Sequence, residues 1–154
     1  MITRRVALLS THTPRQCGIA TFTHDLAEAI AQAQPRTEVL VVGMNDGQTY
    51  SYPDRVALTI EQDDVAAYEA AADALNARAI DVLCVQHEFG IFGGPAGSYL
   101  LTLLRRVRSP IVTTLHTVLE NFTPEQFAVI EELALLSAKL IVMSERAVSF
   151  LVAQ

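Results

Sequence analysis

Polar side chains that can bind a ligand or carry a proton follow several apolar runs of the chain, at the point where each predicted strand ends. They are His12 after residues 6–9, His87 and Glu88 after residues 82–85, and His116 after residues 111–115. Of the four histidines, His24 alone falls inside a predicted helix. Ligands of open α/β sheets bind beyond the carboxyl ends of the strands. We therefore expect a binding or catalytic site at this edge.

Each of these features also has a structural interpretation. His116 directly follows a buried strand, which places its ring over the floor of the site, but a half-buried histidine with satisfied hydrogen bonds fits as well. His87 and Glu88 precede the aromatic and glycine-rich residues 89–94, a stretch typical of a binding loop. The alternative is a salt-bridged pair within a plain connection.

Gly18 directly precedes the first predicted helix. It permits either a tight turn or the close approach of a phosphate to the helix N-terminus, and both interpretations fit the sequence. Cys17 is a candidate nucleophile with a lowered pKa. Thr23, however, stands where a phosphatase-type C-x5-R loop needs an arginine, so a packing role for Cys17 is favoured.

Several motifs are absent. The sequence contains neither GxxxxGK[ST] nor GxSxG, the glycines at 90–97 do not form GxGxxG, and His87-Glu88 is not part of HExxH. A metal site formed by Cys17 and the histidines at positions 12, 87 and 116 lacks paired ligand spacing. No metal and no cofactor are therefore predicted.

The elements that position these residues alternate along the chain. Strands are predicted at residues 6–9, 39–42, 56–60, 82–85, 111–115 and 140–143. Helices are predicted at residues 19–30 (inner face Ile19, Phe22, Leu26 and Ile30), at 65–75 after a cap at Asp63 or Asp64, at 95–107, after Thr123, and from Ser144. Apolar strands alternating with helices are typical of an α/β protein: a Rossmann-like three-layer sandwich with a mainly parallel sheet.

Composition limits the class of protein. Of the 154 residues, 51% are hydrophobic and 18% charged, which excludes a disordered tail and fits a single domain over residues 1–154. The net charge of -6 argues against a nucleic-acid duplex or an anionic membrane as the main partner, but not against a small phosphate ligand.

The sequence also leads to expectations about the cellular location of the protein and about the C-terminal end of the domain. No uncharged apolar run approaches the ~18 residues of a spanning helix, and we expect the N-terminal residues 1–10 to contain a buried strand and not a signal peptide. Two cysteines without a CxxC pair indicate a reducing, cytoplasmic location. The last predicted helix stops at Gln154 without a C-cap, so we expect a domain truncated at its C-terminus.

Four motifs together resemble one enzyme family. They are Thr13-Pro14-Arg15-Gln16-Cys17-Gly18-Ile19-Ala20-Thr21-Phe22, Gln86-His87-Glu88-Phe89-Gly90-Ile91-Phe92-Gly93-Gly94, Thr114-Leu115-His116-Thr117, and Val142-Met143-Ser144-Glu145-Arg146-Ala147. Their order along essentially the whole chain resembles the N-terminal domain of bacterial group 1 glycosyltransferases. These are retaining GT-B enzymes with two Rossmann-like domains that face each other across a cleft.

The resemblance implies a role for each motif. Gly18 would lie near the donor pyrophosphate, and His116 would contact the transferred sugar near the reacting centre. The acceptor or the sugar would be faced by His87, Glu88, Gly93 and Gly94, with His12, Thr117 and Ser144 as additional candidates. The partners implied are a nucleotide-sugar donor and a glycan, lipid or small-molecule acceptor, with peripheral membrane contact left open.

The family's C-terminal, donor-binding domain is not represented in the sequence. The resemblance therefore predicts an acceptor-side half that is inactive alone. The alternative is a non-catalytic Rossmann-like module that binds a nucleotide or a protein partner.

Overall fold

The computed structural model describes residues 3–153 and contains one six-stranded, all-parallel sheet over this range. The strands are β1 (Arg5–Ser10), β2 (Glu38–Asn45), β3 (Val56–Glu61), β4 (Val82–His87), β5 (Ile111–Leu115) and β6 (Lys139–Val142). Their order across the sheet is β3-β2-β1-β4-β5-β6. The direction of strand order reverses between β1 and β4, which is where open α/β sheets bind their ligands.

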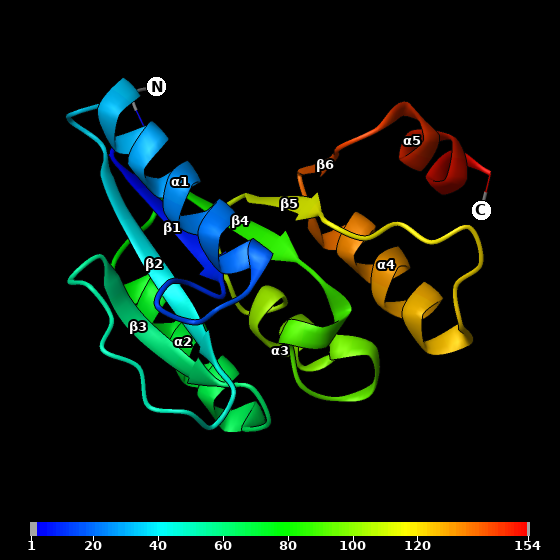
Figure 1. Ribbon diagram of the computed structural model, residues 1–154, viewed down its shortest axis with the longest axis horizontal. Helices are drawn as coiled ribbons and strands as arrows, with labels where there is room; N and C mark the ends of the chain where they lie inside the picture. Colours follow the sequence, from blue (N-terminus) through cyan, green and yellow to red (C-terminus); the bar gives the residue numbers. More distant parts are fainter. Residues whose placement is uncertain (1–2, 154) are drawn as a thin grey trace.

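Helices cover both faces of the sheet (Figure 1). They are α1 (Gly18–Ala33), α2 (Val65–Ala77), α3 (Tyr99–Leu104), α4 (Pro124–Leu136) and α5 (Glu145–Val152), with two short 3-10 segments, η1 (Phe89–Ile91) and η2 (Pro95–Gly97). Helix α1 packs on one face, and α2, α3 and α4 pack on the other. The predicted Rossmann-like three-layer sandwich is thereby confirmed.

The two cores explain why the strand sequences are apolar without alternation. Ala7 and Leu9 point into the larger core with α2, α3 and α4, whereas Val6 and Leu8 point into the smaller core with α1. Successive side chains of a strand project to opposite faces, so a strand covered on both sides needs an apolar residue at every position.

Two predicted helix starts have the expected caps. Thr123 Oγ1 accepts a hydrogen bond from the Gln126 N–H, and the Gln126 side chain accepts one from the Thr123 N–H, which completes a capping box ahead of α4. Of the two aspartates considered for α2, Asp64 is the cap, since its carboxylate accepts from the Ala66 N–H at 3.0 Å.

The boundaries of three predicted elements were wrong. The helix predicted over 95–107 is broken into η2 and α3, because Ala96 (φ 52°) and Gly97 (φ 77°) adopt the left-handed conformation. Strand β2 continues to Asn45, and β4 continues to His87. Gln86 and His87 therefore end a strand instead of following one.

Helix α1 lies on the sheet through smaller side chains than predicted. Its fully buried residues are Ala20, Thr23 and Ala27, while Phe22 is 38% exposed. Small side chains let the helix approach the sheet closely. Phe22 is thereby left at the margin of the helix, next to the carboxyl ends of the strands.

Candidate functional site

The carboxyl edge of the sheet brings together Gly18, His87 and His116, as predicted. Strands β4 and β5 are neighbours, and the His116 N–H donates to the His87 carbonyl oxygen at 3.0 Å. Gly18 begins α1, and Phe22, one helical turn later, packs edge-on against the His116 ring with 4.8 Å between ring centroids. The second turn of α1 thus packs against the His116 ring, and Gly18 begins the same helix.

The His116 ring is half-buried and held from two sides. Its Nε2 lies 2.9 Å from the Gln86 side-chain oxygen, and Phe22 packs against the ring. Burial lowers the pKa of His116, although the Glu88 carboxylate acts in the opposite direction. A ring with a lowered pKa is neutral at neutral pH, so it can accept a hydrogen bond as well as donate one. Sequence reasoning assigned no role to Gln86.

Glu88 is bound to the next strand end and makes no ion pair with His87. The Thr117 hydroxyl donates to a Glu88 carboxylate oxygen, which joins the ends of β4 and β5. The ion pairs among the described residues do not include His87 with Glu88, so the alternative of a salt-bridged pair is wrong. Glu88 and Thr117 remain partly exposed beside His116.

His87 points away from the exposed edge. Its side chain has no exposed surface, and it packs edge-on against Phe89 (4.9 Å between ring centroids) and stacks on Phe92 (6.0 Å). Neither ring nitrogen has a hydrogen-bond partner. Burial lowers the pKa of His87 to about 4, and His116 adds to this effect. A ligand reaches this ring only if the aromatic cover moves.

The N-terminus of α1 has free donors. Cys17 Sγ accepts from the Ala20 N–H at 3.3 Å and contacts Thr11 Oγ1 at 3.2 Å, so the thiol caps the helix. Within residues 3–153, the N–H groups of Gly18 and Ile19 have no hydrogen-bond partner, and the first turn carries no acidic residue. Such a terminus attracts anions through its N–H groups and the helix dipole.

A Cβ on Gly18 would meet no atom within 4 Å, and the residue has no positive φ. The tight turn therefore does not explain a glycine at this position. Open space in front of the free N–H groups instead favours the interpretation in which a ligand approaches the backbone.

His12 lies between β1 and α1 and is fully buried. Its Nδ1–H donates to the Thr13 carbonyl oxygen at 2.8 Å, and its ring packs edge-on against His24 at 5.4 Å between centroids. Burial lowers the pKa of His12, and its Nε2 is buried without a partner. Its side chain thus lies under α1 and is closed to solvent.

Gly93 lies against the end of β3 and against α2, and Gly94 lies against Ser98 and Tyr99 at the start of α3. The Gly93 N–H donates to the Tyr68 hydroxyl at 2.9 Å, and that hydroxyl donates to the Gln62 carbonyl oxygen at 2.8 Å. Burial raises the pKa of Tyr68 to about 12, so the phenol keeps its proton. Gly94 has a φ of 79°. Packing and backbone conformation therefore account for both glycines without a ligand.

We predict that Gly93→Ala lowers the free energy of unfolding by about 3 kcal/mol or more. The new Cβ would lie 2.0 Å from the Gln62 carbonyl oxygen, so the backbone must shift. The measurement is chemical denaturation. Gly90→Ala is the matched control, because a Cβ there meets no atom within 4 Å. Equal stability of the two variants would contradict the packing explanation.

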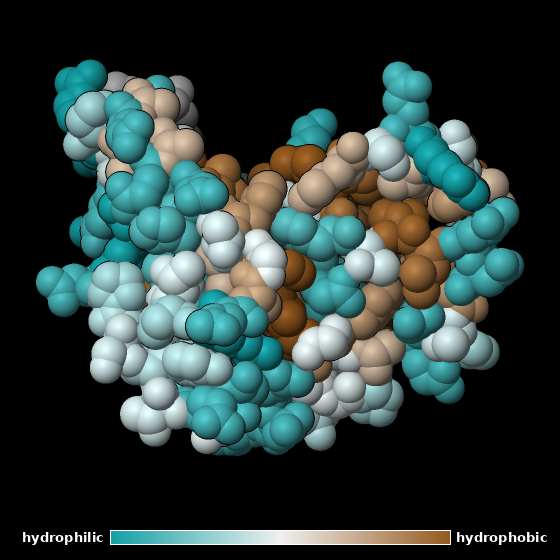
Figure 2. All heavy atoms as spheres, in the orientation of Figure 1, coloured by the Kyte–Doolittle hydropathy of each residue, from teal (hydrophilic) through white to brown (hydrophobic). Residues whose placement is uncertain are grey.

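A groove of about 430 Å³ opens beside His116, between the loop after β5 and helix α5. It is lined by Leu115, His116, Val118, Leu119, Glu120, Met143, Ser144, Arg146, Ala147 and Phe150. Ser144 caps α5, and Arg146 lies over the Phe150 ring at 5.2 Å. Figure 2 shows apolar surface gathered over β5, β6 and α5, and Ile141 and Met143 are exposed there.

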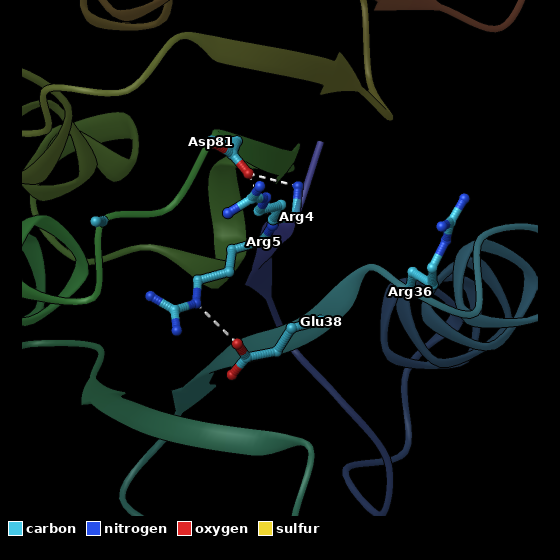
Figure 3. A pocket seen from close by; sticks show the side chains of 6 residues that line it. Arg4, Arg5, Arg36, Glu38 and Asp81 are labelled. Carbon is cyan, nitrogen blue, oxygen red and sulfur yellow. Dashed lines mark hydrogen bonds and ion pairs between the residues drawn. The ribbon is translucent and has the colours of Figure 1, made fainter. Parts of the chain in front are cut away.

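A second hollow, of about 720 Å³, lies at the opposite, amino edge of the sheet (Figure 3). Arg5 Nε donates to Glu38 at 2.8 Å, and the Asp81 carboxylate accepts from the backbone N–H groups of Arg4 and Arg5. Arg36 stands apart from this network in Figure 3. These contacts join the starts of β1 and β2 to the residue before β4, so they hold strand ends together.

Across residues 3–153, no three His, Cys, Asp or Glu side chains gather in a way that could hold a metal ion. In the same range, no helix has both the length and the apolar character needed to cross a bilayer.

Comparison with known proteins shows the fold. No family model matches the chain, and a search of curated proteins found no match. Among solved structures, an alpha-glucosyltransferase in complex with UDP and a 13-mer DNA with a central A:G mismatch is similar, with a TM-score of 0.62 and 14% identity. The match covers 92% of this chain and 37% of that enzyme. A conserved protein from Enterococcus faecalis V583 has a TM-score of 0.48 and 11% identity over 99% of this chain and 100% of that one.

The fold is thus glycosyltransferase-like: a Rossmann-type α/β domain that resembles part of a GT-B enzyme. The chain spans 37% of the length of the glucosyltransferase it matches.

Proposed function

We propose that this chain is the acceptor-side domain of a retaining group 1 glycosyltransferase, which moves a sugar from a nucleotide-sugar to an acceptor without a metal ion. The observation that carries the proposal is the juxtaposition of a neutral His116 with the unsatisfied N-terminus of α1, at the edge of the sheet where strand order reverses. The glycosyltransferase-like fold supports it.

The N–H groups of Gly18 and Ile19 would bind the donor diphosphate. Negative charge grows on this group as the glycosidic bond breaks, and preorganised N–H donors stabilise such charge without reorganising during the reaction. The UDP in the complex of the similar glucosyltransferase supports a nucleotide diphosphate as the leaving group.

His116 would contact the transferred sugar. The ring is partly exposed and neutral, so it can form a hydrogen bond with a sugar hydroxyl beside the reacting carbon. Glu88, which is tied to Thr117, and Ser144, on the wall of the same groove, would adjoin the acceptor. The apolar part of the groove, which includes Leu119, Met143 and Phe150, favours an acceptor with an apolar portion.

Catalysis would require a second domain. The site lies on an open edge, and transfer depends on holding the donor and the acceptor in one geometry from both sides. The similar glucosyltransferase has a longer chain, of which this fold accounts for 37%. We therefore expect no sugar transfer by the 154 residues alone.

The proposal predicts where a nucleotide-sugar binds and which substitution abolishes binding. Titration of the ¹⁵N-labelled chain with UDP-glucose or GDP-mannose should shift the amide signals of Gly18 and Ile19 most. Gly18→Val should weaken binding at least ~10-fold, because its side chain fills the space in front of the free N–H groups. The readouts are the dissociation constant from the titration and the melting temperature.

Gly90→Val is the matched control, since that glycine is also exposed and a Cβ there also meets open space. It should leave both the dissociation constant and the melting temperature unchanged. If Gly18→Val binds as the natural chain does, or if ligand shifts concentrate at another edge of the sheet, the phosphate assignment is wrong.

A further inference from the structure

Gln86 is a buried polar residue whose side chain meets the candidate sugar contact. It occupies the last position but one of β4, and 1% of its surface is exposed. Alternation along the strand puts it on the face of Cys84 and not on that of His87. On that face its partner is His116, since Gln86 Oε1 lies 2.9 Å from His116 Nε2.

This contact determines where the proton of the His116 ring resides. An amide oxygen only accepts hydrogen bonds, so the Nε2 atom that faces it must carry the proton. In a neutral imidazole the other nitrogen then has a free lone pair. Within residues 3–153, no hydrogen bond involves His116 Nδ1.

Strand pairing and packing make this arrangement rigid. Gln86 pairs in register with Thr114 of β5, and the His116 N–H is bonded to the His87 carbonyl oxygen. Phe22 packs against the other side of the ring. The two strand ends and α1 therefore fix the ring plane, while the amide oxygen fixes the tautomer.

We propose that Gln86 is a positioning residue: its amide oxygen keeps the His116 proton on Nε2, so that Nδ1 is presented as the acceptor for a ligand hydroxyl. The identity of that hydroxyl as one of the transferred sugar rests on the proposed function. The tautomer itself does not, because it follows from the chain's own contacts.

The charged groups near His116 are largely paired with other residues. Glu120 and Arg146 line the same groove as His116 and form an ion pair at 3.7 Å. Glu88, from the end of β4, is tied to Thr117, and the neighbouring His87 is neutral above about pH 4. Phe22 on the α1 side carries no charge. A new carboxylate in the place of the Gln86 amide would therefore act strongly on the ring.

The test is long-range ¹H–¹⁵N spectroscopy of the histidine rings in the full chain, without any ligand. The natural chain should show His116 protonated at Nε2 and unprotonated at Nδ1. Gln86→Met removes the acceptor at similar length, so both tautomers should become populated. Gln86→Glu keeps the acceptor and adds a charge, so Nε2 should stay protonated while the pKa of His116 rises by about 1 unit or more.

Cys84→Ala is the control, since it alters the same face of β4 two residues earlier and Cys84 has no hydrogen bond to His116. It should leave the His116 signals unchanged. A natural chain protonated at Nδ1, or Gln86→Met with an unchanged tautomer, would overturn the proposal. If Gln86→Met does not fold, the proposal is tested with Gln86→Glu, and an unchanged pKa of His116 in that variant would also overturn it.

Addition of a nucleotide-sugar separates this inference from the proposed function. In one outcome the chain shows the expected tautomer while the Nδ1 signal of His116 does not change on saturation with UDP-glucose or GDP-mannose. That result would refute the sugar contact and leave the Gln86–His116 hydrogen bond supported. A shift at Nδ1 that is lost in Gln86→Met but kept in Gln86→Glu, measured at a pH above the raised pKa of His116 so that Nδ1 is unprotonated, would support both.

Discussion

Acidification from neutral pH to about pH 4.5 is expected to lower the free energy of unfolding by about 2 to 3 kcal/mol, with His87 as the main cause. The pKa of His87 is about 4 in the folded chain and 6.5 when the ring is exposed. Between pH 6.5 and pH 4, His87 is therefore protonated in the unfolded chain and neutral in the folded chain. The contribution of neutral His87 to the free energy of unfolding is fully present above pH 6.5, and it is lost as the pH falls toward 4.

Removal of the ring should remove this pH dependence. His87→Leu replaces a buried ring with two unpartnered nitrogens by an apolar side chain, so stability at neutral pH should be retained or increased. Urea denaturation at several pH values measures the slope. His12 and His116, whose pKa values burial also lowers, add a smaller slope of the same sign that remains in the variant.

Val85→Ala is the matched control, since Val85 is buried on the same strand and face. It should lower the free energy of unfolding by a similar amount at every pH and leave the slope intact. An equally steep slope in His87→Leu would show that other groups cause the acid sensitivity.

The strand ends were the part of the site that the sequence predicted best. His116 follows β5 as expected, and Gly18 begins α1, because continuous apolar runs and helix-start residues carry strong local signals. The parallel sheet follows from the alternation of elements, whereas the strand order comes from the structure. The edge on which the candidates meet was therefore predictable without coordinates.

Side-chain direction was harder to predict, because it depends on where β4 ends. The apolar run stops at Val85, but hydrogen bonding to β5 extends the strand through Gln86 and His87. Extension by two residues puts His87 on the face of Val85, in the core, and turns Gln86 toward His116. Because Gln86 and His87 are polar, the sequence pattern did not indicate that β4 continues through them.

The roles of the glycines depend on tertiary contacts. Gly93 is required by the Gln62 carbonyl oxygen, thirty-one positions earlier in the sequence, whereas the space in front of Gly18 is open. The resemblance assigned both glycines to ligand contacts, Gly18 to the donor phosphate and Gly93 to the acceptor or the sugar, because a glycine in the sequence indicates only that a side chain is absent there. Their difference arises from which element packs against each backbone.

The final prediction concerns His116. In a two-domain enzyme formed by joining this chain to a donor-binding domain of the group 1 family, His116→Ala is expected to lower kcat by about 10²–10⁴-fold. The ring is partly exposed at the strand end, so under the proposed function its loss removes a polar contact beside the reacting carbon while most of the core stays intact. The measurement is transfer of radiolabelled sugar, with the 154-residue chain alone, for which we expect no transfer, as the reference.

Stability separates a chemical role from a structural one. His116→Ala leaves Gln86 without a partner, which costs about 1 kcal/mol and a few degrees of melting temperature. His24→Ala removes a ring that lies on α1 beside His12, and it should leave kcat near that of the unsubstituted two-domain protein. Turnover that survives His116→Ala, or that falls only as far as the folded fraction falls, would assign the ring to structure. A large loss of kcat in a folded His116→Ala variant, with kcat retained in His24→Ala, would assign the His116 ring to the reaction. Of these two rings, it is that of His116 that lies at the open edge of the sheet.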